Sequence, residues 1–136
     1  MPRHEAKELS MKNQYYISRN HYLELYYFCK QYNSWKKEYE NLIAVKGVNF
    51  DERINDSNVS DPTSKLAERR LELFHKMELV EQTLIEASPD LYEFIFMNIT
   101  DDASYKYLSS RYLVPCSEKT FYKYRRRFFW LLAKKR

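Results

Sequence analysis

Apolar side chains recur at helical spacing over most of this 136-residue chain, and two such stretches open it. The first, from about Ser18, is apolar nearly all round, which predicts a helix covered on more than one side. Its main face comprises Tyr22, Leu25, Tyr26, Cys29 and Tyr32. After a break at Asn33-Ser34, a second helix places Trp35, Tyr39, Leu42 and Ile43 on one side. We expect residues 1–44 to form an αα-hairpin.

The pattern lapses over residues 45–60, which predicts a polar connector containing the chain's single glycine, Gly47. Asp61-Pro62 then opens a long helix that continues to about Glu86. Its apolar residues follow a spacing close to that of a coiled coil: Leu66, Leu73, Met77, Val80 and Leu84. We expect this seam to pack on the N-terminal hairpin. Homodimerisation, through the hairpin or through the helix at 64–86, stays open.

In the last third of the chain the caps and the apolar spacing predict three shorter helices. Ser88-Pro89-Asp90 caps a helix over 91–98, and Asp101-Asp102 starts a short helix through Tyr112. A final helix begins at Ser117, whose hydroxyl can accept a hydrogen bond from a free backbone N–H. Phe121, Phe128 and Leu132 share its apolar face.

A short helix, a turn and a capped basic helix form the pattern of a helix-turn-helix. The sequence therefore predicts an all-α helical bundle with an N-terminal αα-hairpin at 1–44, a connector at 45–60, and a long helix plus a helix-turn-helix at 61–136. The glycine that often occupies the turn of this motif is absent here.

Charge singles out the last helix. Residues 117–136 hold eight Lys or Arg and one acid, a local charge of +7, while the net charge of the chain is +4 and the rest therefore carries −3. Interleaving of these cations with aromatic side chains at helical spacing favours contact with nucleic acid. The candidates for contacts to base edges are Ser117, Lys119, Thr120 and Lys123. The candidates for phosphate contacts are Arg126, Arg127, Lys134, Lys135 and Arg136.

Composition argues against other classes of function. With one glycine there is no phosphate-binding loop, dinucleotide fingerprint or nucleophile elbow. Cys29 and Cys116 have no CxxC spacing and the histidines fit no zinc spacing, so we expect two free buried thiols, no metal and no cofactor. No catalytic partner is visible for any serine, histidine or cysteine, so an enzyme is not expected. No stretch is long enough to span a membrane, and the expected location is the cytoplasm.

Three segments resemble a known family: Asp61-Pro-Thr-Ser-Lys-Leu-Ala-Glu68, the long helix after it, and Tyr107-Leu-Ser-Ser followed by Ser117-Glu-Lys-Thr-Phe-Tyr-Lys-Tyr-Arg125. They are similar to the RinA/ArpU-like phage and prophage regulators of Gram-positive bacteria, over roughly residues 15–136. The resemblance implies a compact helical protein that ends in a helix-turn-helix like that of sigma-factor region 4. It also implies a transcriptional activator whose recognition-helix positions are the four base-edge candidates above. The aromatic N-terminal hairpin departs from the family pattern.

The function predicted from the sequence is that of a DNA-binding transcriptional regulator of phage or prophage type, acting on double-stranded DNA in a bacterial cell. Two alternatives stay open: a phage-encoded inhibitor of a host nucleic-acid enzyme, and a DNA-packaging recognition subunit. RNA polymerase or another host protein is a second partner to be tested.

Overall fold

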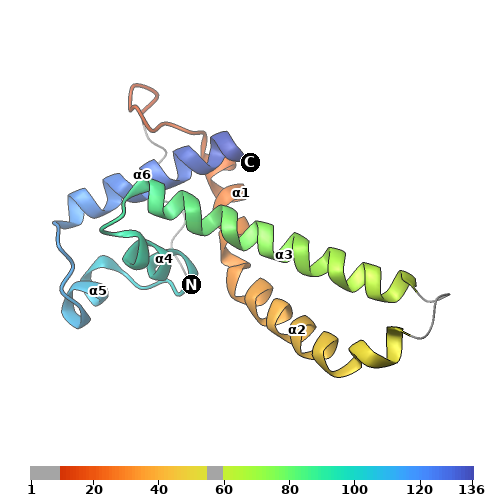
Figure 1. Cartoon of the computed structure of the whole chain (residues 1–136). Coiled ribbons are helices and arrows are strands. Elements are labelled where there is room, and N and C mark those ends of the chain that lie inside the picture. Colours follow the sequence, from red (N-terminus) through yellow and green to blue (C-terminus); the bar gives the residue numbers. More distant parts are fainter. Residues whose placement is uncertain (1–9, 55–59) are drawn as a thin grey trace. The chain divides into compact units, whose positions relative to one another are not determined.

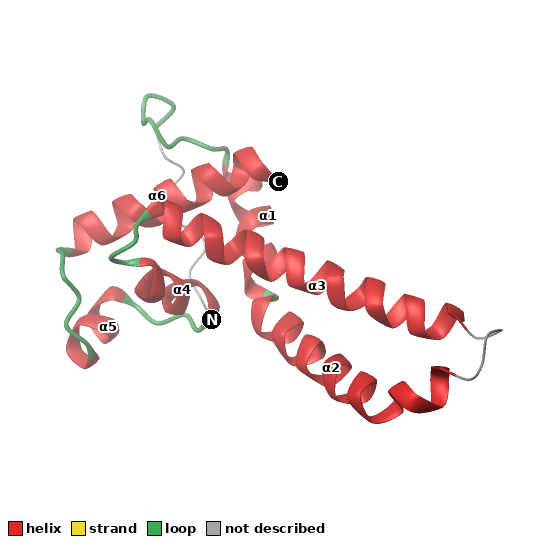
Figure 2. Cartoon of the chain, viewed as in Figure 1, coloured by secondary structure: helices red, strands yellow, loops and turns green. Residues whose placement is uncertain are grey.

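A computed structural model describes residues 10–54 and 60–136 (Figure 1). All regular elements in this part of the chain are helices, which confirms the all-α prediction (Figure 2). They are α1 (Arg19–Lys30), α2 (Tyr32–Ile54), α3 (Ser60–Ala87), α4 (Tyr92–Thr100), α5 (Tyr105–Arg111) and α6 (Glu118–Lys135). None of these helices combines the length and the apolarity needed to cross a membrane.

The chain divides into two compact units that differ from the predicted domains. Residues Tyr32–Leu79 form the α2–α3 hairpin, and Met1–Gln31 together with Val80–Arg136 form the second unit, called the terminal unit below. The predicted αα-hairpin within 1–44 is wrong, because α1 packs against α4 and α6 whereas α2 belongs with the first part of α3. The predicted packing of α1 on more than one side is therefore provided by α4 and α6, which come from the C-terminal third of the chain.

The predicted connector at 45–60 is also wrong over its first ten residues. α2 continues through Gly47 to Ile54, and α3 already includes Ser60. Residues 55–59 lie outside the described part. A single glycine costs a helix only about 1 kcal/mol relative to alanine, and no proline interrupts 32–54. The break predicted at Asn33-Ser34 lies earlier, at Gln31, which caps α1 before α2 begins.

The terminal unit has an aromatic and aliphatic core centred on α6. Phe121, Phe128 and Leu132 are completely buried, as their spacing predicted. The rings of Tyr22 on α1 and Phe129 on α6 meet edge to face, with centroids 4.9 Å apart. The other fully or almost fully buried side chains come from every other helix of the unit: Leu25, Tyr26, Cys29, Val80, Leu84, Ile95, Ile99 and Leu108.

In the α2–α3 hairpin the two helices run side by side in opposite directions (Figure 1). Leu73 of α3 is fully buried and Trp35 of α2 nearly so, which places the core of this unit between the helices. On one flank Arg69 binds Glu38 through two hydrogen bonds of 2.7 and 2.9 Å. Lys76 lies over the Trp35 ring on the same flank, with its amine 5.6 Å from the centroid.

Both cysteines are free thiols, but only one of them is buried as predicted. Cys29 lies in the core of the terminal unit, and burial raises the pKa of its thiol to about 12. Cys116 is half-buried in the segment before α6, and burial raises the pKa of its thiol more weakly.

The central role of the α6 core predicts a contrast between two leucines. Leu132→Ala removes a fully buried side chain and should lower the free energy of unfolding by about 2–5 kcal/mol. Leu113→Ala, at a position that is 95% exposed, should change it by no more than about 0.5 kcal/mol. Urea unfolding followed by circular dichroism measures both values, and equal losses for the two variants would contradict this packing.

Candidate nucleic-acid interface

The first turn of α6 is built by Ser117. Its backbone is extended, and its hydroxyl oxygen accepts a hydrogen bond from the backbone N–H of Thr120 at 3.3 Å. The same hydroxyl donates to the Thr120 hydroxyl at 3.1 Å. Ser117 is therefore the helix cap that the sequence predicted. The two hydroxyls named as base-contact candidates are bonded to each other. Ser117 would have to give up this bond to donate to a base, whereas Thr120 accepts it and keeps its own hydroxyl proton for donation.

Lys119 and Lys123 are both exposed and lie one helical turn apart, with Cβ atoms separated by roughly 6 Å. Within the described residues, neither amine forms an ion pair with a carboxylate. The Lys123 amine lies 5.7 Å from the centroid of the neighbouring Tyr124 ring. With the exposed Glu118 in the same turn, these two lysines leave the capped end of α6 with a net charge of +1, and the partial positive charge of the helix N-terminus adds to it.

The middle of α6 carries Arg126 and Arg127, both half-buried. The Nε of Arg126 is buried and has no hydrogen-bond partner in the described structure. Further along, the Lys134 amine lies over the Trp130 ring at 3.5 Å from the centroid, and Tyr15 meets the same ring edge to face at 5.5 Å. The segment before α1 therefore covers part of α6 near its C-terminal end.

The last two candidates for phosphate contacts are already paired with carboxylates. Lys135 binds Glu86 of α3 at 2.6 Å and holds the pKa of that carboxyl below its ordinary value through this hydrogen bond. Arg136 binds Glu24 of α1 at 3.0 Å, and its guanidinium lies 4.0 Å from the centroid of the Phe28 ring. These two cations join the end of α6 to its neighbours, which weakens the prediction that they contact phosphates.

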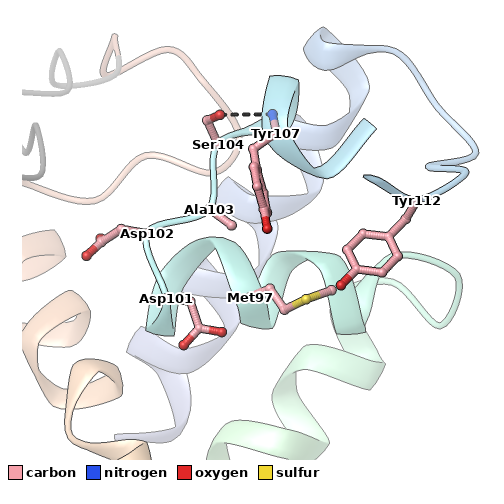
Figure 3. A pocket seen from close by; sticks show the side chains of 7 residues that line it. All are labelled: Met97, Asp101, Asp102, Ala103, Ser104, Tyr107 and Tyr112. Carbon is pink, nitrogen blue, oxygen red and sulfur yellow. Dashed lines mark hydrogen bonds between the residues drawn. The ribbon is translucent and has the colours of Figure 1, made fainter. Parts of the chain in front are cut away.

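α5 begins later than predicted. Its cap is Ser104, whose hydroxyl accepts a hydrogen bond from the backbone N–H of Tyr107 at 3.1 Å (Figure 3). The prediction that Asp101-Asp102 starts this helix is wrong, because Asp101 caps the end of α4 through a hydrogen bond from its N–H to the Met97 carbonyl. Asp102 follows with φ = 57°, a left-handed conformation that is incompatible with a helix start.

Asp102 connects this turn to α1. Its carboxylate accepts hydrogen bonds from the Tyr26 hydroxyl at 2.9 Å and from the Lys30 amine at 2.8 Å. Lys30 also donates to the carbonyl of Thr100 at 3.2 Å, at the end of α4. We call these contacts the Asp102 clamp. They fix the turn that sets the direction of α5.

The phenol of Tyr26 keeps its proton at physiological pH and therefore remains a hydrogen-bond donor to Asp102. Burial raises the pKa of its phenol above the ordinary value of 10, and the hydrogen bond to the Asp102 carboxylate raises it further. A group whose pKa is raised by folding contributes its full stability below the unfolded-state pKa. The contribution of Tyr26 is therefore complete below about pH 10 and is lost only as the pH rises through the raised pKa.

A second set of contacts joins α6 to the same turn. Arg125 donates from Nε to the side-chain oxygen of Asn98 at 2.6 Å, and the Asn98 amide donates to the carbonyl of Ala103 at 2.9 Å. The Arg125 guanidinium also lies over the Phe129 ring, 5.1 Å from its centroid. Arg125 therefore holds α6 against α4, although the sequence alone does not distinguish it from the other arginines of the basic helix.

α5 and α6 pack through Leu108 and Phe121, both fully buried, and the Tyr105 ring lies 5.6 Å from that of Phe121. The Tyr105 hydroxyl donates to the carbonyl of Cys116. Six residues, 112–117, connect the two helices, more than the three or four of a compact helix-turn-helix turn. The arrangement is thus two packed helices with a longer, tyrosine-anchored connection.

The structure adds surface residues on α5 that the sequence did not single out. Lys106 and Arg111 are exposed, and neither forms an ion pair with a carboxylate in the described residues. Beside them an open groove of ≈ 440 Å³ contains Tyr107 and Tyr112, whose rings point toward Met97 (Figure 3). The exposure of Lys106 and Arg111 could have been predicted from their positions on the helix relative to the buried Leu108. α5 has only seven residues, however, which is too few for a clear hydrophobic periodicity.

No protein-family model matches this chain, and no curated protein or solved structure shows significant similarity to it. The resemblance to RinA/ArpU-like regulators stays a prediction. The function is therefore inferred from the residues and their geometry.

The Asp102 clamp predicts that Asp102→Ala lowers the free energy of unfolding by about 1 kcal/mol. This loss comes from the two hydrogen bonds and is discounted because the Asp102 side chain is 41% exposed. The steric cost of the left-handed conformation is similar for aspartate and alanine and therefore largely cancels in this substitution. Asp102→Gly loses the same hydrogen bonds but removes that steric cost of about 1 kcal/mol, so it should be more stable than Asp102→Ala.

The matched control is Asp101→Ala, which removes the adjacent carboxylate and should change stability by less than about 0.5 kcal/mol. Urea titration of the three variants provides the comparison. If Asp101→Ala costs as much as Asp102→Ala, the Asp102 clamp does not hold the turn.

Proposed function

We propose that this protein binds double-stranded DNA through the N-terminal half of α6 and acts as a sequence-specific transcriptional regulator. The observation that carries the proposal is the pair Lys119 and Lys123, exposed at a capped helix start and without a carboxylate partner in the described residues. A DNA-binding helix presents its first turns to base edges and is held by a second helix behind it. α5, the Asp102 clamp and the Arg125–Asn98 bond supply that support.

The major groove, about 12 Å wide, admits an α-helix, and a lysine at its floor donates to the O6 and N7 acceptors of guanine. In this proposal Lys119 and Lys123 would make such contacts. The side chains of Ser117 and Thr120 are shorter than those of the lysines and suit contacts at close approach. Thr120 could donate while it still accepts from Ser117, and Ser117 could donate once that bond exchanges. Arg126, Arg127 and Lys134 of α6 would contact phosphates. Lys106 and Arg111 of α5 would contact further phosphates.

A protein-interaction function is the second candidate, in the form of an inhibitor that binds a host nucleic-acid enzyme. The groove beside Tyr107 and Tyr112 favours it, because exposed aromatic side chains in a groove are enriched at protein interfaces. A DNA-packaging recognition subunit is the variant of the leading proposal that requires assembly into a ring. The inhibitor does not account for two unpaired lysines at a capped helix start as directly as DNA binding does, and the packaging variant differs from the leading proposal in its assembly.

The direct test of DNA binding is a mobility-shift titration over a salt series. Lys119→Ala/Lys123→Ala should weaken binding to a selected duplex at least tenfold, since a good base contact is worth about 1–3 kcal/mol. The slope of log K against log[salt] should fall by about 1 for each lysine that also contacts a phosphate. Lys36→Ala/Lys37→Ala, which removes two exposed lysines of the α2–α3 hairpin, is the matched control and should bind like the wild type. Equal affinities for the two double variants, or no shift at about 50 mM salt, would rule the proposal out.

The ion pairs at the end of α6 predict that the paired and unpaired cations of this helix affect different measurements: the salt dependence of DNA binding or the thermal stability. Arg127→Ala/Lys134→Ala should lower the salt slope by about 2, because each removes one phosphate contact. Lys135→Ala/Arg136→Ala should leave the slope nearly unchanged and should instead lower the melting temperature, because these side chains bind Glu86 and Glu24. The same titration, with thermal unfolding monitored in parallel, separates the two effects, and a larger slope change for Lys135→Ala/Arg136→Ala would reverse the assignment.

A further inference from the structure

The segment just before α1 forms two consecutive turns. The backbone N–H of Asn13 donates to the Ser10 carbonyl at 2.8 Å, and that of Tyr16 donates to the Asn13 carbonyl at 3.0 Å. The side-chain oxygen of Asn13 accepts from the backbone N–H of Tyr15 at 2.8 Å. We call residues 10–17 the N-terminal strap. Because of these local hydrogen bonds, the strap is compact rather than extended.

The N-terminal strap is docked on α6 through Tyr15. The Tyr15 ring meets the Trp130 ring edge to face, with centroids 5.5 Å apart (Figure 1). This is a favoured geometry for two aromatic rings. The amine of Lys134 lies over the same Trp130 ring, 3.5 Å from its centroid. One indole therefore contacts both the strap and a cation of α6.

Trp130 belongs to the side of α6 that carries the lysines proposed to contact DNA. Steps of four, seven and four residues connect Lys119, Lys123, Trp130 and Lys134. Residues at these intervals lie on one side of a helix, which we call the cationic face because all three lysines are exposed. Glu118, one residue before Lys119, is turned about 100° away from it. The strap therefore covers part of the cationic face rather than another side of α6.

Charge distinguishes two roles for a strap at this position. A strap that blocks a polyanion site is expected to carry carboxylates, which bind the cations in place of phosphates. The N-terminal strap contains no Asp or Glu and one lysine, Lys12. Lys12 is exposed, and its amine forms no ion pair with a carboxylate in the described residues. The strap therefore adds positive charge to the cationic face, and the partner that fits such a surface is a polyanion.

One carboxylate does border the cationic face, but it belongs to α3. Lys135 lowers the pKa of the Glu86 carboxyl through a hydrogen bond, and Arg127 lowers it further through its charge. Lys135 follows Lys134 directly and is turned about 100° away from it. The carboxylate of Glu86 is thus engaged at the edge of this face and does not neutralise Lys12.

Lys12 lies close enough to the cationic face to extend it. Three steps along the chain separate Lys12 from Tyr15, so their Cα atoms are at most about 11 Å apart. Each strand of duplex DNA carries one phosphate per about 3.4 Å of helix axis. A strand that passes Lys134 therefore offers several phosphates within that distance.

We propose that the N-terminal strap is a second DNA-contacting element, held against α6 by the Tyr15–Trp130 contact so that Lys12 binds a phosphate near the one bound by Lys134. The inference rests on the proposed DNA binding and extends the interface to a segment outside α5 and α6. The strap and α6 are far apart in sequence but belong to the same unit of the structure. Tyr15 and Trp130 act as positioning residues, and Lys12 makes the contact.

Mobility-shift titration of the full chain over a salt series measures the contribution of Lys12. Lys12→Ala should weaken binding to a selected duplex roughly two- to fivefold, the range of one exposed ion pair. It should also lower the slope of log K against log[salt] by about 1. Lys12→Arg should restore both values, because it keeps the charge. Lys36→Ala, which removes one exposed lysine of the α2–α3 hairpin, is the matched control and should leave both unchanged.

Tyr15→Ala tests whether docking of the strap positions Lys12. This variant should bind DNA more weakly than the wild type, and adding Lys12→Ala to it should change the salt slope less than Lys12→Ala does alone. Acrylamide quenching of tryptophan fluorescence checks the docking without DNA. The chain has two tryptophans and Trp35 is only 4% exposed, so quenching reports mainly on Trp130 and should increase in Tyr15→Ala.

Three results would overturn the inference: a salt slope unaffected by Lys12→Ala in a chain that binds DNA, tighter binding by Tyr15→Ala, or equal quenching in Tyr15→Ala and the wild type. Tighter binding would mean that the strap blocks the cationic face. A wild type that shifts no duplex at about 50 mM salt would remove the proposed function itself, so the two failures are distinguishable.

Discussion

The Asp102 carboxylate is the contact on which the rest of the terminal unit depends. It lies in a left-handed turn between α4 and α5, and it is bound by Tyr26 and Lys30 of α1, more than 70 residues earlier in the chain. A non-glycine residue in this conformation costs about 1 kcal/mol, which the hydrogen bonds from α1 offset. α1 thereby fixes the turn from which α5 departs, and α5 in turn supports the start of α6.

The basic helix illustrates how neighbours divide residues that look alike in sequence. Arg125 holds Asn98, Lys135 holds Glu86, and Arg136 holds Glu24, so these cations stabilise the fold. Lys119 and Lys123 form no ion pair with a carboxylate in the described residues, although Glu118 is next to Lys119 in the first turn. The positive charge available to a polyanion is therefore smaller than +7. It comes from Lys119 and Lys123 at the capped end, where the helix dipole has the same sign, and from Arg126, Arg127 and Lys134 further along α6.

Features set by neighbours along the chain could be predicted from the sequence, and features set by distant segments could not. The Ser117 cap and the buried face of Phe121, Phe128 and Leu132 follow from local spacing, and both are found in the structure. The partner of α1 depends on packing with α4 and α6, and no local signal distinguishes these helices from α2. Aspartate is common at helix caps, so the sequence predicts that Asp102 starts α5, but its carboxylate instead binds Tyr26 and Lys30 of α1.

Sequencing of duplexes selected from a random pool by the full-length protein is the most direct measurement of the central claim. A DNA-reading α6 predicts a recurrent motif among the bound duplexes, which is lost with Lys119→Ala/Lys123→Ala and retained with Lys36→Ala/Lys37→Ala. Bound duplexes with the same sequence distribution as the starting pool would contradict sequence-specific recognition by this helix.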